Sequence, residues 1–324
     1  MNAGSADWHR ALREAADWYV CLNEAPANGP ERDAWSQWLR SGPLHAAAWD
    51  KVDAVGRRFA GLREQDEPLA VAAGLRQAAR PGRRRSLRTL AGLLAAGAAG
   101  WMGWRQPAVQ DQLFAWQAEL RTGVGEIRDT RLSDGSRLWM NTASAADFAV
   151  EAAWRRLTLH QGEIMVQTAQ DADRPFVVDT RHGTLRALGT LFLVRRQPAS
   201  VHLAVLEGAV EVRLAGTGDR RVVAHGEQVD FSREHYDDVE ALDAAQAAWR
   251  TGRLNVDDMS LADFLAQLSR YRPGYLAAHP EVAGLRVMGS YPVPDTDAAL
   301  TLLSEVLPVR VHRSLPWWVT VEPR

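Results

Sequence analysis

The stretch RLTLHQGEIMV at residues 156–166 contains two strand-length runs with a Gln161-Gly162 turn signal between them. Short runs of this kind that end at turn residues are typical of β-strands. Similar runs continue in both directions, and they lie at 137–140, 176–178, 191–194, 201–205 and 210–212. Further turn signals lie at 133–136, 207–208 and 224–226. Many short strands at this spacing predict an all-β sandwich or roll, which we place at residues 113–232.

A smaller α/β pattern follows the predicted β domain, at residues 248–324. Strand-length runs lie at 253–256, 286–291, 309–312 and 317–321. Between them, Ser260 opens one helical pattern, and Asp295 or Thr296 opens another. Side-chain oxygens at such positions cap helix N-termini. The order strand, helix, strand occurs twice, so the sequence predicts a small module with an internal β-α-β repeat.

Residues 1–65 have a helical pattern instead. Apolar residues recur three or four positions apart, and breaks at 28–30 and 41–43 divide the pattern into three short amphipathic helices. Such helices predict a small all-α bundle. Two interpretations of its tryptophans stay open, since they either form the core or leave aromatic edges for a partner protein. The tryptophans in question are Trp18, Trp38 and Trp49.

The run TLAGLLAAGAAGWMGW at 89–104 carries no charge. As a helix, its 16 residues span roughly 24 Å, a little less than a hydrocarbon core. The residues that precede it and set its topology are Arg83, Arg84, Arg85 and Arg88. An arginine excess marks the cytoplasmic side of a span. We therefore predict a basic linker at 66–86 and one transmembrane helix at 87–105, with the N-terminus cytoplasmic and the C-terminal domains periplasmic. A buried core helix is the alternative, and the arginines also resemble a twin-arginine export signal.

The composition gives no sign of a metal, cofactor or nucleic-acid site. The formal net charge is -2, without the basic excess that nucleic-acid binding needs. The histidines are not at metal-ligand spacing, and the single cysteine excludes an internal disulfide. No glycine-rich phosphate loop is present. We therefore expect no metal, no cofactor, no direct contact with nucleic acid and no enzyme with turnover.

One dipeptide suggests chemistry of a different kind. Gly189-Thr190 lies between two predicted strands. A threonine hydroxyl that a strained turn presents can attack the preceding carbonyl carbon, which gives an N→O acyl shift and then hydrolysis. The alternative is that Gly189 only permits a tight turn. Such self-cleavage happens once in each chain and is not catalysis with turnover.

The order of these parts resembles the FecR family of transmembrane sigma-factor regulators, which serve bacterial cell-surface signalling. Three motifs are similar to its helical anti-sigma domain: ADW at 16–18, WSQWL at 35–39 and PLHAAAW at 43–49. Six motifs are similar to its periplasmic β domain: TGVGE at 122–126, LSDGS at 132–136, LHQGE at 159–163, RPFVV at 174–178, LGTLF at 188–192 and VLEG at 205–208. The C-terminal repeat resembles the short N-terminal module of secretins and TonB-dependent receptors. One departure is Gly56, where a large apolar residue is expected.

The resemblance implies partners for both ends of the chain. An extracytoplasmic-function sigma factor would bind the helical domain through Trp18, Trp35, Trp38, Leu39 and Trp49. The signalling domain of a TonB-dependent outer-membrane receptor would bind the C-terminal module through Trp317, Trp318 and Val319. Such a regulator resides in the inner membrane, controls iron-uptake genes and signals through periplasmic and intramembrane proteases. Some family members also cut themselves at a Gly-Thr pair, which matches Gly189-Thr190.

Two other classes of protein stay open. One is a one-component DNA-binding regulator, which the balanced charge of the helical region disfavours. The other is a membrane-anchored periplasmic protein that binds glycans or the envelope. For this second class, Trp317 and Trp318 would form an aromatic platform.

Overall fold

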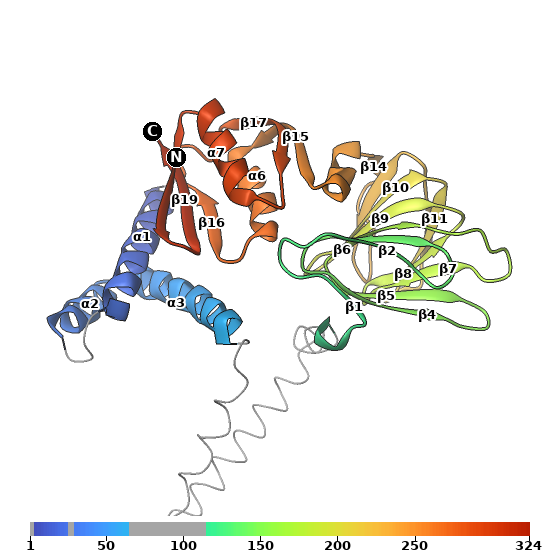
Figure 1. The fold of residues 1–324 in the computed structure, drawn as a ribbon, viewed down its shortest axis with the longest axis horizontal. Coiled ribbons are helices and arrows are strands. Elements are labelled where there is room, and N and C mark those ends of the chain that lie inside the picture. The colour runs from blue at the N-terminus through green and yellow to red at the C-terminus, as the bar shows by residue number, and fades with distance from the viewer. Residues whose placement is uncertain (1–2, 25–28, 65–114) are drawn as a thin grey trace, which may run out of the picture. The chain divides into compact units, whose positions relative to one another are not determined.

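The computed structural model describes residues 3–24, 29–64 and 115–324. Their contacts form two compact units, one within Met1–Gly74 and Arg253–Arg324 and the other within Leu75–Gly252. The first unit contains three helices and a small α/β module (Figure 1). The second contains two large β-sheets.

Three helices make up the N-terminal region: α1 (Ala3–Glu24), α2 (Pro30–Arg40) and α3 (Pro43–Glu64). Pro30 and Pro43 are the first residues of α2 and α3, a position at which a proline loses no helical hydrogen bond. Ala15, Ala16 and Ala48 are buried in the cluster that α1 and α3 share, and these small side chains let the two helices approach closely. No residue of α2 is fully buried, whereas α1 and α3 each contribute buried residues to this cluster.

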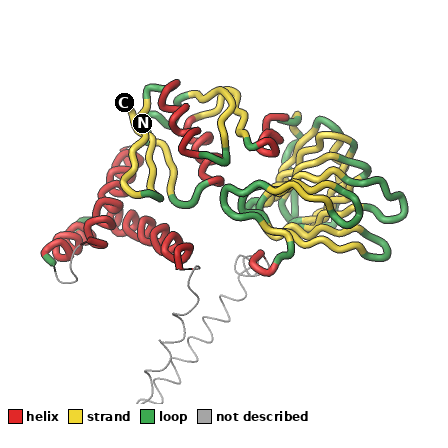
Figure 2. Tube along the Cα trace, viewed as in Figure 1, coloured by secondary structure: helices red, strands yellow, loops and turns green. Residues whose placement is uncertain are grey.

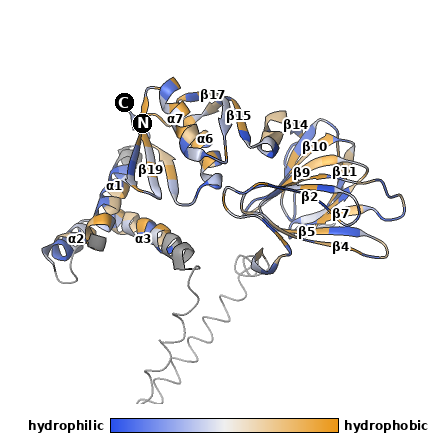
Figure 3. Cartoon of the chain, viewed as in Figure 1, coloured by the Kyte–Doolittle hydropathy of each residue, from blue (hydrophilic) through white to orange (hydrophobic). Residues whose placement is uncertain are grey.

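The predicted fold class is wrong in one element, the transmembrane helix. Within the described residues, no helix is both long and apolar enough to cross a membrane. α1 and α3 have 22 residues each, which is sufficient length, but hydrophilic residues are interleaved along both (Figure 3). The fold class is therefore corrected to a helical region, a β-sandwich and a small α/β module. The predicted span at 87–105 and the basic linker at 66–86, with its four arginines, lie outside the described residues. The inner-membrane location stays a prediction.

The second unit is a sandwich of two seven-stranded sheets, whose strands are yellow in Figure 2. Sheet A contains, in spatial order, β1 (Leu120–Arg121), β4 (Ala145–Val150), β5 (Arg155–Gln161), β7 (Phe176–Asp179), β8 (Gly183–Ala187), β11 (Ala209–Leu214) and β12 (Arg220–Ala224). Sheet B contains β14 (Glu240–Ala241), β13 (Glu227–Phe231), β10 (Val201–Glu207), β9 (Leu191–Arg196), β6 (Glu163–Gln167), β3 (Arg137–Met140) and β2 (Arg128–Arg131). Neighbouring strands are antiparallel, except that β5 and β7 are parallel.

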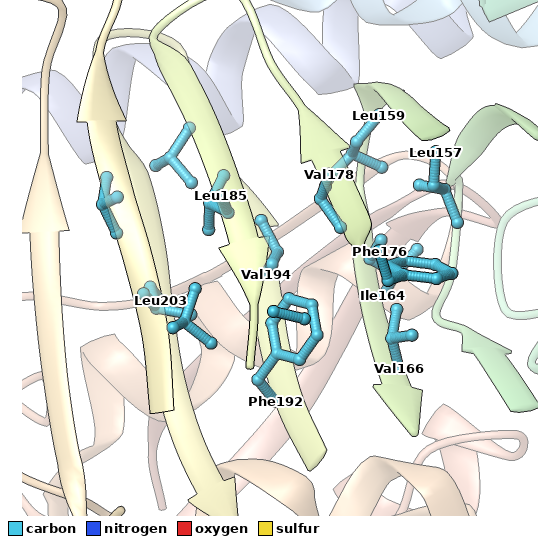
Figure 4. Packing of buried hydrophobic residues seen from close by; sticks show 14 of the residues in the cluster. Leu157, Leu159, Ile164, Val166, Phe176, Val178, Leu185, Phe192, Val194 and Leu203 are labelled. Carbon is cyan, nitrogen blue, oxygen red and sulfur yellow. The ribbon is translucent and has the colours of Figure 1, made fainter. Parts of the chain in front are cut away.

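The core of the sandwich is apolar and lies between the sheets. Leu157 and Leu159 of β5 meet Ile164 and Val166 of β6 in one buried cluster (Figure 4). Between these strands the chain passes from sheet A to sheet B at Gly162, whose φ is +85°. A Cβ on Gly162 would lie 2.5 Å from the Cα of Ser144, so this corner requires glycine. The stretch at 156–166 therefore contributes one strand to each sheet.

The C-terminal module follows a 3-10 helix, η2 (Ala244–Thr251), which ends the second unit. Its elements are β15 (Arg253–Ser260), α6 (Leu261–Leu268), the 3-10 helix η3 (Ser269–Tyr271), β16 (Tyr275–Ala278), β17 (Arg286–Pro292), α7 (Thr296–Val306), β18 (Val309–Leu315) and β19 (Trp318–Pro323). β15 pairs with β17, while β19 pairs with both β16 and β18. As predicted, Ser260 and Asp295 cap α6 and α7, because each side chain accepts a backbone N–H of the first turn. β16 was not predicted.

Candidate functional site

The residues predicted to bind a sigma factor form two aromatic pairs on the helices. Trp18 of α1 lies against Trp38 of α2, with ring centroids 6.5 Å apart. Trp35 of α2 lies against Trp49 of α3, at 4.9 Å. These four tryptophans and Leu39, which we call the aromatic face, are all partly buried. They pack against one another within the bundle and stay partly exposed, so both interpretations of them remain open.

Polar contacts distinguish the two tryptophans of α2. Trp38 Nε1 donates to Glu14 Oε2 at 2.7 Å, and its ring lies 4.9 Å from that of His45. Trp35 Nε1 is buried without a hydrogen-bond partner. A buried donor without a partner costs about 1–3 kcal/mol. α2 thus carries one tryptophan that is anchored and one whose polar atom is not satisfied.

Sequence reasoning missed Tyr19, which joins the aromatic residues of the first unit. Its ring centroid lies 6.1 Å from that of Trp49 and 5.4 Å from that of Trp317, the second in edge-on contact. Gly56 makes room for it, because a Cβ on Gly56 would lie 2.3 Å from the Tyr19 hydroxyl oxygen. The glycine that departs from the family pattern therefore has a steric reason. Tyr19 falls at helical spacing in the sequence, but only the structure shows that its ring contacts Trp49 and Trp317.

The residues predicted to bind a receptor are buried in the first unit. Trp317, Trp318 and Val319 are 6%, 1% and 0% exposed. Trp318 stacks on Tyr275 of β16 at 4.0 Å, and both tryptophans share an apolar cluster with α1 and α3. They therefore do not form an open aromatic platform in this structure. Receptor binding through them would require β19 to separate from the helices.

Charged groups of α1 face the same module. Arg13 Nη2 lies 3.1 Å from Glu322 Oε1, whose side chain is 5% exposed. Burial raises the pKa of the Asp17 carboxyl, although the nearby charges of His312 and Arg13 act in the opposite direction. Within the described ranges, no cluster of His, Cys, Asp or Glu is arranged to hold a metal ion.

Gly189 and Thr190 directly precede β9. Gly189 has a φ of +81°, a left-handed conformation that favours glycine. Thr190 is 5% exposed, and its Oγ1 is buried without a hydrogen-bond partner. The structure thus places a hydroxyl that is not engaged elsewhere directly after a turn glycine. These are two of the features that an N→O acyl shift needs.

Comparison with known proteins assigns the β-sandwich. Residues 118–211 match the family model described as FecR protein, and residues 13–55 match a domain of unknown function, DUF4880. Two crystal structures of a protein assigned as an anti-sigma factor from Parabacteroides distasonis have a similar fold. Each has a TM-score of 0.52 and 19% identity, over 63% of this chain and 98% of that chain. No curated protein matches the chain. The β-sandwich therefore contains, at residues 118–211, a domain that matches the FecR protein family.

Proposed function

We propose that this protein is an anti-sigma factor whose helical region binds an extracytoplasmic-function sigma factor. The observation that carries the proposal is the combination, in one chain, of a FecR-family β-sandwich and a three-helix region with a half-buried aromatic face. The similar crystal structures support it, because the protein they show is assigned as an anti-sigma factor. In this role the chain acts by binding and not by turnover.

The aromatic face suits a protein partner on physical grounds. α2 contributes three of its five residues, yet no residue of α2 is fully buried. Tryptophans on such a surface often dominate the free energy of binding.

Titration of the full chain with its sigma factor tests the proposal. Removal of the Trp38 ring in Trp38→Ala weakens binding by about 2 kcal/mol, or roughly 30-fold, if Trp38 is a central contact. The matched control is Trp116→Ala, because Trp116 lies in the second unit and is 72% exposed. Helical circular dichroism shows whether each variant keeps its helices. Binding that Trp38→Ala and Leu39→Ala both leave unchanged would contradict the proposal.

We propose further that the C-terminal module receives the signal from a TonB-dependent receptor and that the regulated genes serve iron uptake. In the described part of the chain, β15 and β17 pair only with each other, so each has an edge to which an extended receptor segment can add. Met288 of β17 is 67% exposed. The buried residues 317–319 would then support the module from inside. Proteases remain predicted partners.

A direct binding measurement tests the receptor proposal. The signalling domain of the receptor is titrated into the full chain and into Met288→Arg, which places a charge on the β15–β17 sheet. Weaker binding to the variant supports strand addition there. Equal binding would place the receptor elsewhere on the chain.

We also propose that the chain cleaves itself once, between Gly189 and Thr190. Two observations support the proposal: Thr190 Oγ1 has no hydrogen-bond partner, and Gly189 directly before it has a φ of +81°. Mass spectrometry of the purified chain should find two fragments that meet at this bond. Thr190→Ala should yield only the intact chain. The same two fragments from Thr190→Ala would refute the acyl shift.

A further inference from the structure

We propose that Thr168 is a catalytic residue in this self-cleavage. Its hydroxyl holds the nitrogen of the Gly189–Thr190 bond and supplies the proton that this nitrogen needs when it leaves. The inference rests on the proposed self-cleavage, and the experiment below distinguishes the failure of one from the failure of the other.

Three hydrogen bonds join Thr168, the residue after β6, to Thr190. The Thr190 N–H donates to Thr168 Oγ1 at 3.0 Å. The Thr168 N–H donates to Thr190 O at 3.0 Å, and the Thr168 hydroxyl donates to the same oxygen at 3.3 Å. Thr190 N is the nitrogen of the bond that breaks. The Thr168 hydroxyl is therefore in direct contact with a reacting atom.

The other side of the scissile bond is fixed by the turn between β10 and β11. The Leu188 N–H donates to Ala209 O at 3.1 Å. Gly208, with a φ of +77°, lies so close that a Cβ on it would be 2.3 Å from Gly189 O and 2.9 Å from Thr190 Cγ2. The Thr190 methyl group thus faces Gly208, while Oγ1 stays without a partner. Contacts on both sides limit the motion of the peptide before the reaction, which favours attack.

The proposed step balances protons as follows. Thr190 Oγ1 attacks the Gly189 carbonyl carbon, forms a C–O bond and loses its proton. The C–N bond breaks, and Thr190 N leaves as an amine because Thr168 Oγ1 donates a proton to it. The proton released by Thr190 Oγ1 reprotonates Thr168 through a water molecule. A second water then hydrolyses the ester to the Gly189 carboxylate and the free Thr190 hydroxyl.

The rate of fragment formation after cell-free synthesis of the full chain tests the role of Thr168. Thr168→Val keeps the shape but lacks the hydroxyl, so it should slow cleavage by roughly 100-fold. Thr168→Ser keeps the hydroxyl and should cleave at close to the parent rate. Thr184→Val is the matched control, because the Thr184 hydroxyl donates to Asp179 Oδ1 at 2.7 Å and touches neither reacting residue. This control should cleave at the parent rate.

Hydroxylamine separates the two stages, since it cleaves esters readily and ordinary amides slowly. Thr168→Val should not respond to it, because the ester does not form. Two results would overturn the role of Thr168 and leave the self-cleavage intact. One is the rapid release of fragments from Thr168→Val by hydroxylamine, and the other is cleavage of Thr168→Val at the parent rate. If the parent chain forms no fragments, the self-cleavage and the role of Thr168 both fail. Should Thr168→Val not fold, Thr168→Ala is compared with Thr168→Ser, and equal rates would overturn the inference.

Discussion

Replacement of Asp134 by alanine perturbs a buried ion pair that joins the loops of the β-sandwich. Asp134 lies between β2 and β3, and its Oδ2 is 3.1 Å from Arg155 Nη1. The two side chains are only 2% and 4% exposed. Arg155 also donates from Nε to Arg174 O at 2.7 Å and from Nη1 to Ala169 O at 2.9 Å. One guanidinium group at the start of β5 therefore ties the β2–β3 loop to the β6–β7 loop.

The expected effect of Asp134→Ala is large because the change leaves a buried charge without its counter-ion. It also removes the acceptors for the Ser136 N–H at 3.0 Å and the Ser136 hydroxyl at 2.7 Å. Loss of one partner of a buried ion pair costs about 3–5 kcal/mol of folding free energy. For a domain of this size, that corresponds to a fall of about 6–20 °C in unfolding temperature.

Calorimetry of the full chain, with the sandwich transition followed separately, measures this change. Asp129→Ala is the matched control, because the pair of Arg137 with Asp129 has side chains that are 46% and 44% exposed. Loss of such an exposed pair costs less than about 1 kcal/mol. Equal shifts for Asp134→Ala and Asp129→Ala would refute the reasoning that burial makes the first pair critical.

Three other predictions concern the rest of the chain. Gly56→Ala forces Tyr19 to move and should destabilise the helical region by about 1–3 kcal/mol, which helical circular dichroism on heating measures. Burial acts to raise the pKa of Asp297, but hydrogen bonds from two arginines outweigh it and hold that pKa below the ordinary 3.8. The stabilisation from Asp297 is therefore present well above pH 3.8 and is lost as the pH falls through the lowered pKa, which acid unfolding of the parent and of Asp297→Asn will show. Trp249 is 3% exposed, so Trp249→Ala should lower the free energy of unfolding by about 3–5 kcal/mol. Trp249→Phe should lower it by less than about 1.5 kcal/mol, because the Trp249 Nε1 has no hydrogen-bond partner to lose. Chemical denaturation of the two variants measures both changes.

Turn and cap residues made much of the fold predictable from the sequence. Ser260 and Asp295 cap the two helices of the C-terminal module, as their types indicated. The turn at Gly162 separates β5 from β6, although the sequence did not show that these strands belong to different sheets. That information lies in the close approach of Ser144, which comes from a distant part of the chain.

Several strands escaped prediction because their sequences are not strongly apolar. β2 reads RDTR and β8 reads GTLRA, so their strand conformation depends on pairing with β3 and with β7 and β11. Strand preference of this kind is set by tertiary neighbours more than by the residues themselves.

The candidate sites were predictable as residue types but not as environments. The sequence marked the tryptophans of the helical region, yet it did not show that they form two pairs or that Tyr19 contacts Trp49 of one pair. It marked Gly189-Thr190, but Thr168 is 22 positions away and becomes visible only through its hydrogen bond to Thr190 N. The burial of Trp317 and Trp318 likewise depends on residues near the opposite end of the chain.

Affinity purification of the full chain from its own cells, with mass spectrometry of the bound proteins, tests the central claim most directly. The account predicts recovery of an extracytoplasmic-function sigma factor with the parent chain and a marked loss of it with Trp38→Ala, while Trp116→Ala retains it. Recovery of DNA without any sigma factor would contradict the account and favour a DNA-binding regulator.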